Sequence, residues 1–191
     1  MPRLSAPRVP PLADHELDPE LREALGVTSA GVGAGRVLNI FRALAHHPKL
    51  LKRWLVFGSH VLAKSSLPAR ERELAILRVG WQCRSEYEWG QHVLIGRASG
   101  LSADEIDRIA VGPTAPGWSA LDAAILRGVD ELVGDYFLSD ETWNALAAHW
   151  SVEQRLDFVF AVGQYTLVSM ALNSLGVQLD PGVAGFGERT A

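Results

Sequence analysis

Apolar residues recur every three or four positions along most of this chain, and this spacing constrains its fold more than any other feature. It is clearest at Val37, Ile40, Phe41 and Leu44, and again at Leu50, Leu51, Trp54, Leu55, Val61 and Leu62. No convincing alternation of apolar and polar residues indicates a β-strand. Val56-Phe57 and Val159-Phe160 favour strands but lie inside the helical spacing. The pattern predicts an all-α fold with about eight helices.

Helix-capping residues mark where these helices begin. Ser102 with Glu105, and Ser151 with Gln154, have the spacing of a capping box. Ser119 and Ser139 stand at two further predicted starts, and Asp18 precedes Pro19 as an N-cap should. The predicted helices include Pro68 to about Trp81, about Ser85 to Ala98, and Glu153 to about Leu175, the last ending at Gly176.

A chain of 191 residues fits a single domain, which we place at residues 18–180. Residues 1–17 contain four prolines and are predicted to form an extended arm, and the glycine-rich residues 181–191 a flexible tail. Glycines from 26 to 35 predict a loop after the first helix. The segment 111–117 is the clearest interior linker.

Composition narrows the possible partners. The formal net charge is −4 with no block of like charges, which argues against nucleic-acid binding. The N-terminus lacks the apolar region of a signal peptide, and no apolar run reaches the roughly 18 residues needed to span a bilayer. The single cysteine, Cys83, cannot form an internal disulfide. We therefore expect a cytoplasmic protein.

Three chemically useful side chains share one face of the helix predicted from Ser85. At about 100° per residue, Ser85, Glu88 and His92 fall within a wedge of about 60°. Glu88 and His92 are four residues apart and can hydrogen-bond. A carboxylate raises the pKa of a neighbouring imidazole and fixes its tautomer, which suits general acid–base catalysis.

The preceding helix adds two charges to an otherwise apolar segment. Glu73 shares a stripe with Ile76, Leu77 and Gly80, so its carboxylate is expected to be partly desolvated. Arg78 lies within the buried run and needs a counter-charge, for which Glu73, Glu88 and a substrate carboxylate are the candidates.

These residues resemble the carboxymuconolactone decarboxylase and AhpD-like family. The resemblance is carried by Glu73, Leu77, Ser85-x-Tyr87-Glu88-x-x-x-His92 and Gly100-Leu101-Ser102-x-x-Glu105-Ile106. It is sharpest over residues 70–110 and extends over about 36–175. It implies an AhpD-like helical bundle and a homo-oligomer.

The family includes hydroperoxide reductases with a Cys-x-x-Cys-x-x-x-His motif and decarboxylases of a lactone acid. Here Glu73 and His92 match the glutamate and histidine of the first branch, whereas Ser85 and Glu88 stand where the two cysteines would be. Cys83 lies two residues before the first of these positions, rotated by about 160° if the helix extends that far. A thiol–disulfide cycle at those two positions is therefore excluded.

The leading hypothesis is a decarboxylase-like enzyme that uses acid–base chemistry on a small, carboxylated lactone or enol-type metabolite. His92 is the expected general acid/base, Glu88 its orienting partner and Glu73 a second proton-transfer group; the expected substrate-binding residues are Arg78, Ser85, Tyr87 and Trp89. One alternative is a hydroperoxide reductase that uses Cys83 with an external thiol. Another is a non-catalytic, ligand-binding oligomer. No metal or other cofactor is predicted, because one histidine and two carboxylates are common without one.

Overall fold

The computed structural model describes residues 4–28 and 36–187, and every regular element in that part of the chain is a helix. In chain order the elements are α1 (Pro19–Thr28), α2 (Asn39–Leu44), α3 (Pro48–Ala63), α4 (Ala69–Gln82), α5 (Glu86–Ala98), α6 (Ala103–Val111), α7 (Ala120–Gly134), α8 (Asp140–Ala147) and α9 (Val152–Leu175). The predicted all-α class is confirmed. The loop predicted from Gly26 starts later than expected, because α1 continues through Gly26 to Thr28. The rest of that predicted loop, at Gly31, Gly33 and Gly35, lies outside the described residues.

The predicted caps form where the sequence places them. Ser102 and Ser151 each make a complete capping box, and the hydroxyls of Ser119 and Ser139 accept a backbone N–H from the first turn of α7 and α8. At the other end of α9, Gly176 has φ 69°, the left-handed conformation that a glycine tolerates best. Short polar signals therefore mark where α6, α7, α8 and α9 begin, and Gly176 marks where α9 ends.

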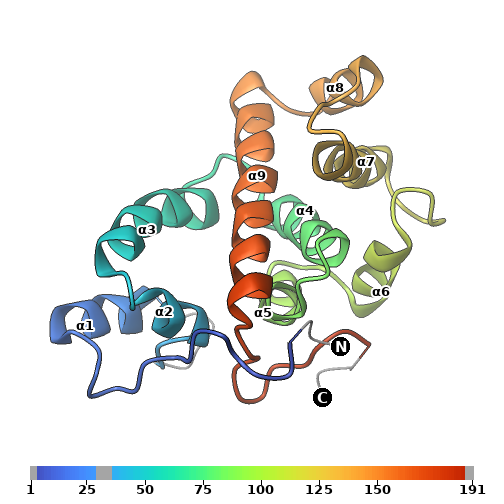
Figure 1. The fold of residues 1–191 in the computed structure, drawn as a ribbon. Helices are drawn as coiled ribbons and strands as arrows, with labels where there is room; N and C mark the ends of the chain where they lie inside the picture. The colour runs from blue at the N-terminus through green and yellow to red at the C-terminus, as the bar shows by residue number, and fades with distance from the viewer. Residues whose placement is uncertain (1–3, 29–35, 188–191) are drawn as a thin grey trace.

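Helix α9 runs through the middle of the molecule, with α1–α3 on one side and α4–α8 on the other (Figure 1). The larger hydrophobic core is built around α4, whose Leu74, Ile76, Leu77 and Val79 are almost completely buried. This helix packs against α5, α6, α7 and α9. The apolar run that the sequence shows in α4 is thus the centre of the fold.

A second, smaller core lies among the first three helices. Its members include Leu21 and Leu25 of α1, Phe41 of α2 and Leu51 of α3. The two cores lie on opposite sides of α9, and the region between them is not completely filled. The pocket described below lies in that region.

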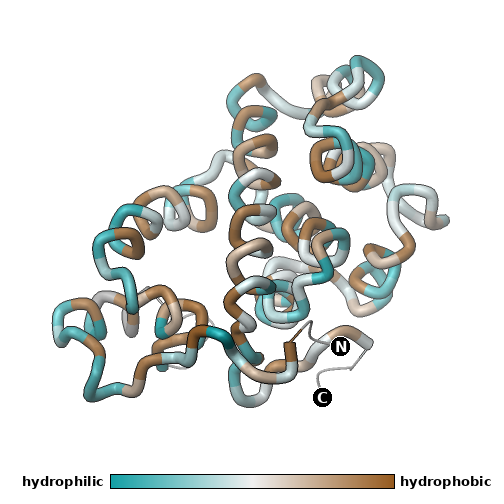
Figure 2. Tube along the Cα trace, viewed as in Figure 1, coloured by the Kyte–Doolittle hydropathy of each residue, from teal (hydrophilic) through white to brown (hydrophobic). Residues whose placement is uncertain are grey.

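Helix α9 is apolar along most of its length (Figure 2). By length and composition it could cross a bilayer, which qualifies the expectation that no segment is apolar enough to do so. One such helix is weak evidence of a membrane span, because a core helix passes the same test. Phe158, Ala161 and Val162 of α9 are in fact buried in the larger core.

The two ends of the chain lie against the helical body. From the predicted arm, Arg8 and Val9 donate their backbone N–H groups to the carbonyl oxygen of Leu175. From the predicted flexible tail, Phe186 packs on Trp81 and Trp89, with ring centroids 5.2 and 5.6 Å apart. Residues 181–187 are therefore held against α4 and α5, and residues 1–3 and 188–191 lie outside the described part.

Candidate functional site

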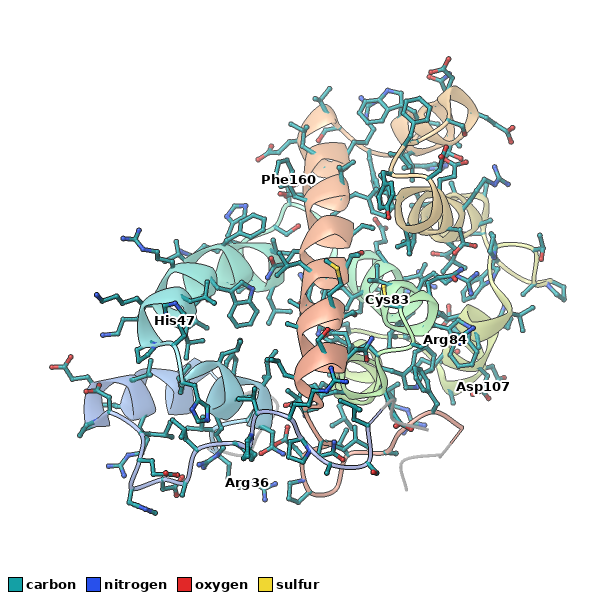
Figure 3. All side chains as sticks on the ribbon, viewed as in Figure 1. Arg36, His47, Cys83, Arg84, Asp107 and Phe160 are labelled. Atoms are coloured by element: carbon teal, nitrogen blue, oxygen red, sulfur yellow. The ribbon has the colours of Figure 1, made fainter. Side chains whose placement is uncertain are left out.

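A tight turn joins α4 to α5 and places their polar faces together. Arg84 has φ 50°, a conformation uncommon for a residue with a side chain, and Ser85 is the N-cap of α5. The helix does not extend back to Cys83, which ends α4 instead, so the predicted rotation of about 160° between Cys83 and Ser85 does not apply. Figure 3 labels Cys83 and Arg84 at this turn.

Glu73, His92 and Glu88 form a linear array of carboxylate, imidazole and carboxylate. The His92 Nδ1 lies 2.6 Å from Glu73 Oε2, and its Nε2 lies 3.0 Å from Glu88 Oε1. All three side chains are buried. The predicted pairing of Glu88 with His92 is present. Glu73 makes the shorter contact, however, and it fixes the orientation of the ring through Nδ1. The orienting role expected of Glu88 therefore fits Glu73 better.

The array holds a proton on the imidazole. Burial alone lowers the pKa of His92, but the charge and hydrogen bond of Glu73, followed by those of Glu88, raise it to about 10 overall. On the far side of Glu73, Arg72 Nε lies 3.2 Å from its Oε1. His92 is thus an imidazolium at neutral pH, with both ring nitrogens engaged.

A pocket of about 120 Å³ opens on Glu88 and His92 but not on Glu73. Helices α2, α3, α5 and α9 supply its walls, which are mostly apolar. Its lining residues are Leu38, Ile40, Phe41, Trp54, Leu55, Gly58, Ser59, Leu62, Tyr87, Glu88, Gln91, His92, Ile95, Gln164, Tyr165 and Val168. An apolar pocket with a few convergent polar groups is the usual form of a small-molecule site.

Tyr165 reaches this pocket from α9. Its ring meets the His92 imidazole edge to face, at 4.9 Å between centroids. Burial raises the pKa of the Tyr165 phenol well above its ordinary value, and the charges of Glu88 and Glu73 add to the effect. The hydroxyl therefore stays protonated and can donate a hydrogen bond to a bound molecule.

Tyr87 and Gln91 form another part of the wall and are held by Asp180. The buried Asp180 carboxylate accepts a hydrogen bond from the Tyr87 hydroxyl. It also accepts hydrogen bonds from Gln91 Nε2 at 2.8 Å and from the Asn39 backbone N–H at 3.0 Å. Nearby, a Cβ added at Gly90 would stand 2.6 Å from the Ala184 carbonyl oxygen, so only glycine allows the tail so close to α5. The C-terminal segment thus fixes one wall of the pocket.

Arg78 is placed away from the pocket, and its counter-charge is none of the three candidates. Its Nε and Nη2 contact the two carboxylate oxygens of Asp130 on α7, at 2.7 and 2.8 Å, while Nη1 donates to the Ile109 carbonyl at 2.7 Å. This bidentate ion pair satisfies the guanidinium and joins α4 to α6 and α7. Asp130 lies 52 positions away, too far for spacing to reveal.

The other predicted substrate-binding residues do not all line the pocket. Tyr87 lines the pocket, whereas Ser85 and Trp89 do not. Ser85 is buried and its hydroxyl finds no hydrogen-bond partner in the described part of the chain. Trp89 turns instead to Trp81, 5.4 Å away between ring centroids. Cys83 also lies outside the pocket lining and is half-buried against the larger core.

The pocket residues that the sequence analysis missed include the polar Gln91, Gln164 and Tyr165. Gln164 and Tyr165 are polar residues in the long uncharged part of the last helix, which was a usable signal. Within residues 4–28 and 36–187, no group of three or more histidine, cysteine, aspartate or glutamate side chains could hold a metal ion.

Solved structures with this fold define the class. The chain is similar to the alkylhydroperoxidase AhpD core of an uncharacterized peroxidase-related protein from Ralstonia eutropha JMP134, with TM-score 0.80 and 20% identity over 92% of this chain and 93% of that one. It is also similar to a single-residue variant of the debrominase Bmp8 in complex with 2,3,4-tribromopyrrole, with TM-score 0.77 and 13% identity over 91% of each chain. A peroxidase-related protein from Silicibacter sp. TM1040 matches with TM-score 0.77 and 13% identity, covering 93% and 96%. The fold is AhpD-like.

A family model matches part of the chain. Residues 48–129 match the carboxymuconolactone decarboxylase family, and this segment contains Glu73, Glu88 and His92. Together with the shared fold, this match confirms the resemblance to the carboxymuconolactone decarboxylase and AhpD-like family that the sequence shows. No curated protein matches the sequence.

Proposed function

We propose that this protein is an enzyme that transfers a proton on a small carbonyl or enol-type substrate. The observation that carries the proposal is the Glu73–His92–Glu88 array, whose Glu88 end opens on the pocket while its Glu73 end is sealed. A carboxylate held by an imidazolium at one edge of an apolar pocket is an arrangement suited to general-base catalysis.

Each residue has a defined part in the step. The Glu88 carboxylate removes a proton from a carbon beside the substrate carbonyl, and the carbonyl becomes an enolate. The Tyr165 hydroxyl donates a hydrogen bond to the enolate oxygen, because its raised pKa keeps it protonated. Glu88 then returns the proton to the same or a neighbouring carbon. His92 orients Glu88, and Glu73 holds His92 in position.

The comparisons support an enzyme without deciding the reaction. The match to a decarboxylase family and the likeness to a debrominase agree with chemistry on small ring compounds in this fold. A lyase activity would use the same Glu88 and His92. The peroxidase alternative depends on Cys83, which lies outside the pocket lining, so the pocket geometry favours acid–base chemistry.

The test follows proton transfer directly. Two probes are cyclohexanone, whose α-hydrogens exchange with deuterium, and α-angelica lactone, whose double bond migrates on enolisation. Both are followed by NMR with the purified protein. We expect Glu88→Gln to lower the rate by about 100-fold or more, the usual contribution of a general base. Glu141→Gln is the matched control, since Glu141 is exposed and distant from the pocket on α8.

A Glu88→Gln protein with the wild-type rate on either probe contradicts the proposal. Peroxide consumption that disappears in Cys83→Ser establishes the peroxidase alternative instead. Binding to the pocket without turnover of any probe favours the non-catalytic alternative.

A further inference from the structure

We infer that this pocket selects an uncharged, mostly apolar molecule of about single-ring size and disfavours small carboxylates. The inference rests on the proposed function only in taking this pocket as the substrate site. It departs from the carboxylated substrate expected from sequence, which relied on Arg78.

In the described part of the chain, no cationic side chain is available to bind a carboxylate. Neither a lysine nor an arginine of residues 4–28 and 36–187 lines the pocket. Arg78 is fully engaged with Asp130 on the other side of α4.

The imidazolium of His92 is no substitute for an arginine. Its two N–H groups are directed at Glu73 and Glu88, 2.6 and 3.0 Å away, which leaves none for a ligand. Two further donors of the wall, the Tyr87 hydroxyl and Gln91 Nε2, are taken by Asp180. The donors that remain are uncharged, and they include the hydroxyl of Tyr165 beside His92 and the indole N–H of Trp54, which finds no partner among the described residues.

The local charge is also unfavourable to an anion. Glu88 presents a carboxylate at the pocket surface, and two carboxylates share the single positive charge of His92. The balancing Arg72 lies beyond Glu73, away from the pocket. A carboxylate entering this apolar space would lose its water and gain a like charge as neighbour, and both effects oppose binding.

Size and lining complete the description of the ligand. A cavity of about 120 Å³ is slightly smaller than the engineered cavity of about 150 Å³ that binds benzene. Leu38, Phe41, Leu55 and Val168 surround this space with apolar carbon. A single ring with one oxygen-bearing group near Tyr165 matches both the volume and the polarity.

The test compares two ligands that share one ring, benzyl alcohol and benzoate, by calorimetric or NMR titration at pH 7. We expect benzyl alcohol to bind wild-type protein at least tenfold more tightly than benzoate. Glu88→Gln should improve benzoate binding by about tenfold and change benzyl alcohol binding by less than about threefold, because it removes the like charge and preserves shape. Glu141→Gln should leave both affinities unchanged.

A further variant locates the binding. Gly58 lines the pocket beside Trp54 and Gln164, so Gly58→Leu fills the space and should abolish benzyl alcohol binding in a protein whose helical circular dichroism is intact. Benzoate binding equal to that of benzyl alcohol, an unchanged ratio in Glu88→Gln, no binding of either ligand, or binding that survives Gly58→Leu would each overturn the inference. Selective binding of benzyl alcohol without proton exchange on the probes above would leave it standing and refute the proposed function alone.

Discussion

His92 carries the positive charge that balances the carboxylates of this site, because Glu73 and Glu88 flank its buried imidazole. Its pKa of about 10 means that it stays charged where an ordinary histidine has lost its proton. In the proposed reaction, proton transfer is therefore better assigned to Glu88 than to His92, the residue that the sequence suggested. The ion pair with Glu73 stabilises the folded protein only while His92 is charged.

This charge predicts how stability varies with pH. Below about pH 6.5 both folded and unfolded chains carry the His92 proton, so its stabilising contribution is complete. Between about pH 6.5 and 10 the folded chain alone keeps it, so stability falls as pH rises, by up to about 1.4 kcal/mol per pH unit. Urea unfolding of wild type and His92→Gln across this range should show the difference between them shrinking. Parallel pH curves would refute the charged state.

At the scale of single residues, the sequence predicted which side chains come together better than how they are arranged. Glu73, Glu88 and His92 were identified from helix spacing and family resemblance, and the structure brings them together. The sequence did not predict that His92 lies between Glu73 and Glu88. That arrangement depends on the turn at Arg84, where the backbone adopts φ 50° and brings α4 beside α5. The partners of Arg78 and Tyr87 lie 52 and 93 positions away, beyond the reach of any local pattern.

At the scale of elements, α4 links α5, which carries part of the site, to α7. Its Glu73 pairs with α5, and its Arg78 pairs with Asp130 of α7. The helix boundaries were largely predictable, since Ser, Asp and Gly caps act over a few residues. The packing of these helices was not, because it depends on which apolar faces meet.

Substitution of Arg78 tests whether this residue joins helices or binds substrate. Arg78→Ala leaves Asp130 of α7 without its partner and should lower the free energy of unfolding by about 3 kcal/mol or more, as for other broken buried ion pairs. Arg78→Lys should lose less. Because Arg78 does not line the pocket, KM for a converted probe should stay within about twofold in the protein that remains folded. A large rise in KM with unchanged stability would restore the substrate-binding role.

At the scale of the whole molecule, α9 exposes an apolar stripe. Val152, Leu156, Phe160, Leu167 and Met170 follow helical spacing, and each is at least half exposed. Phe160, which Figure 3 labels on α9, also meets Phe57 of α3 edge to face, at 6.2 Å between centroids. In the same stripe, a Cβ at Gly163 would have nothing within 4 Å, so another surface can approach closely.

We propose that a second copy of the chain covers this stripe. In light scattering, the wild-type protein should elute as an oligomer, and Phe160→Glu should shift it toward a monomer. Glu153→Gln, on the same helix but outside the stripe, should leave the mass unchanged. A wild-type monomer at micromolar concentration would contradict the proposal. Binding of the wild type to neutral lipid vesicles would assign the stripe to a membrane surface instead.

The hydrogen bonds that Tyr87 and Gln91 donate to Asp180 also affect when the pocket can form during protein synthesis. The chain is synthesised from its N-terminus, so Glu88 and His92 of α5 emerge well before the last wall of their pocket. Gln164, Tyr165 and Asp180 come much later in the sequence. Until α9 and Asp180 have left the ribosome, a nascent chain therefore carries Glu88 and His92 without a complete pocket.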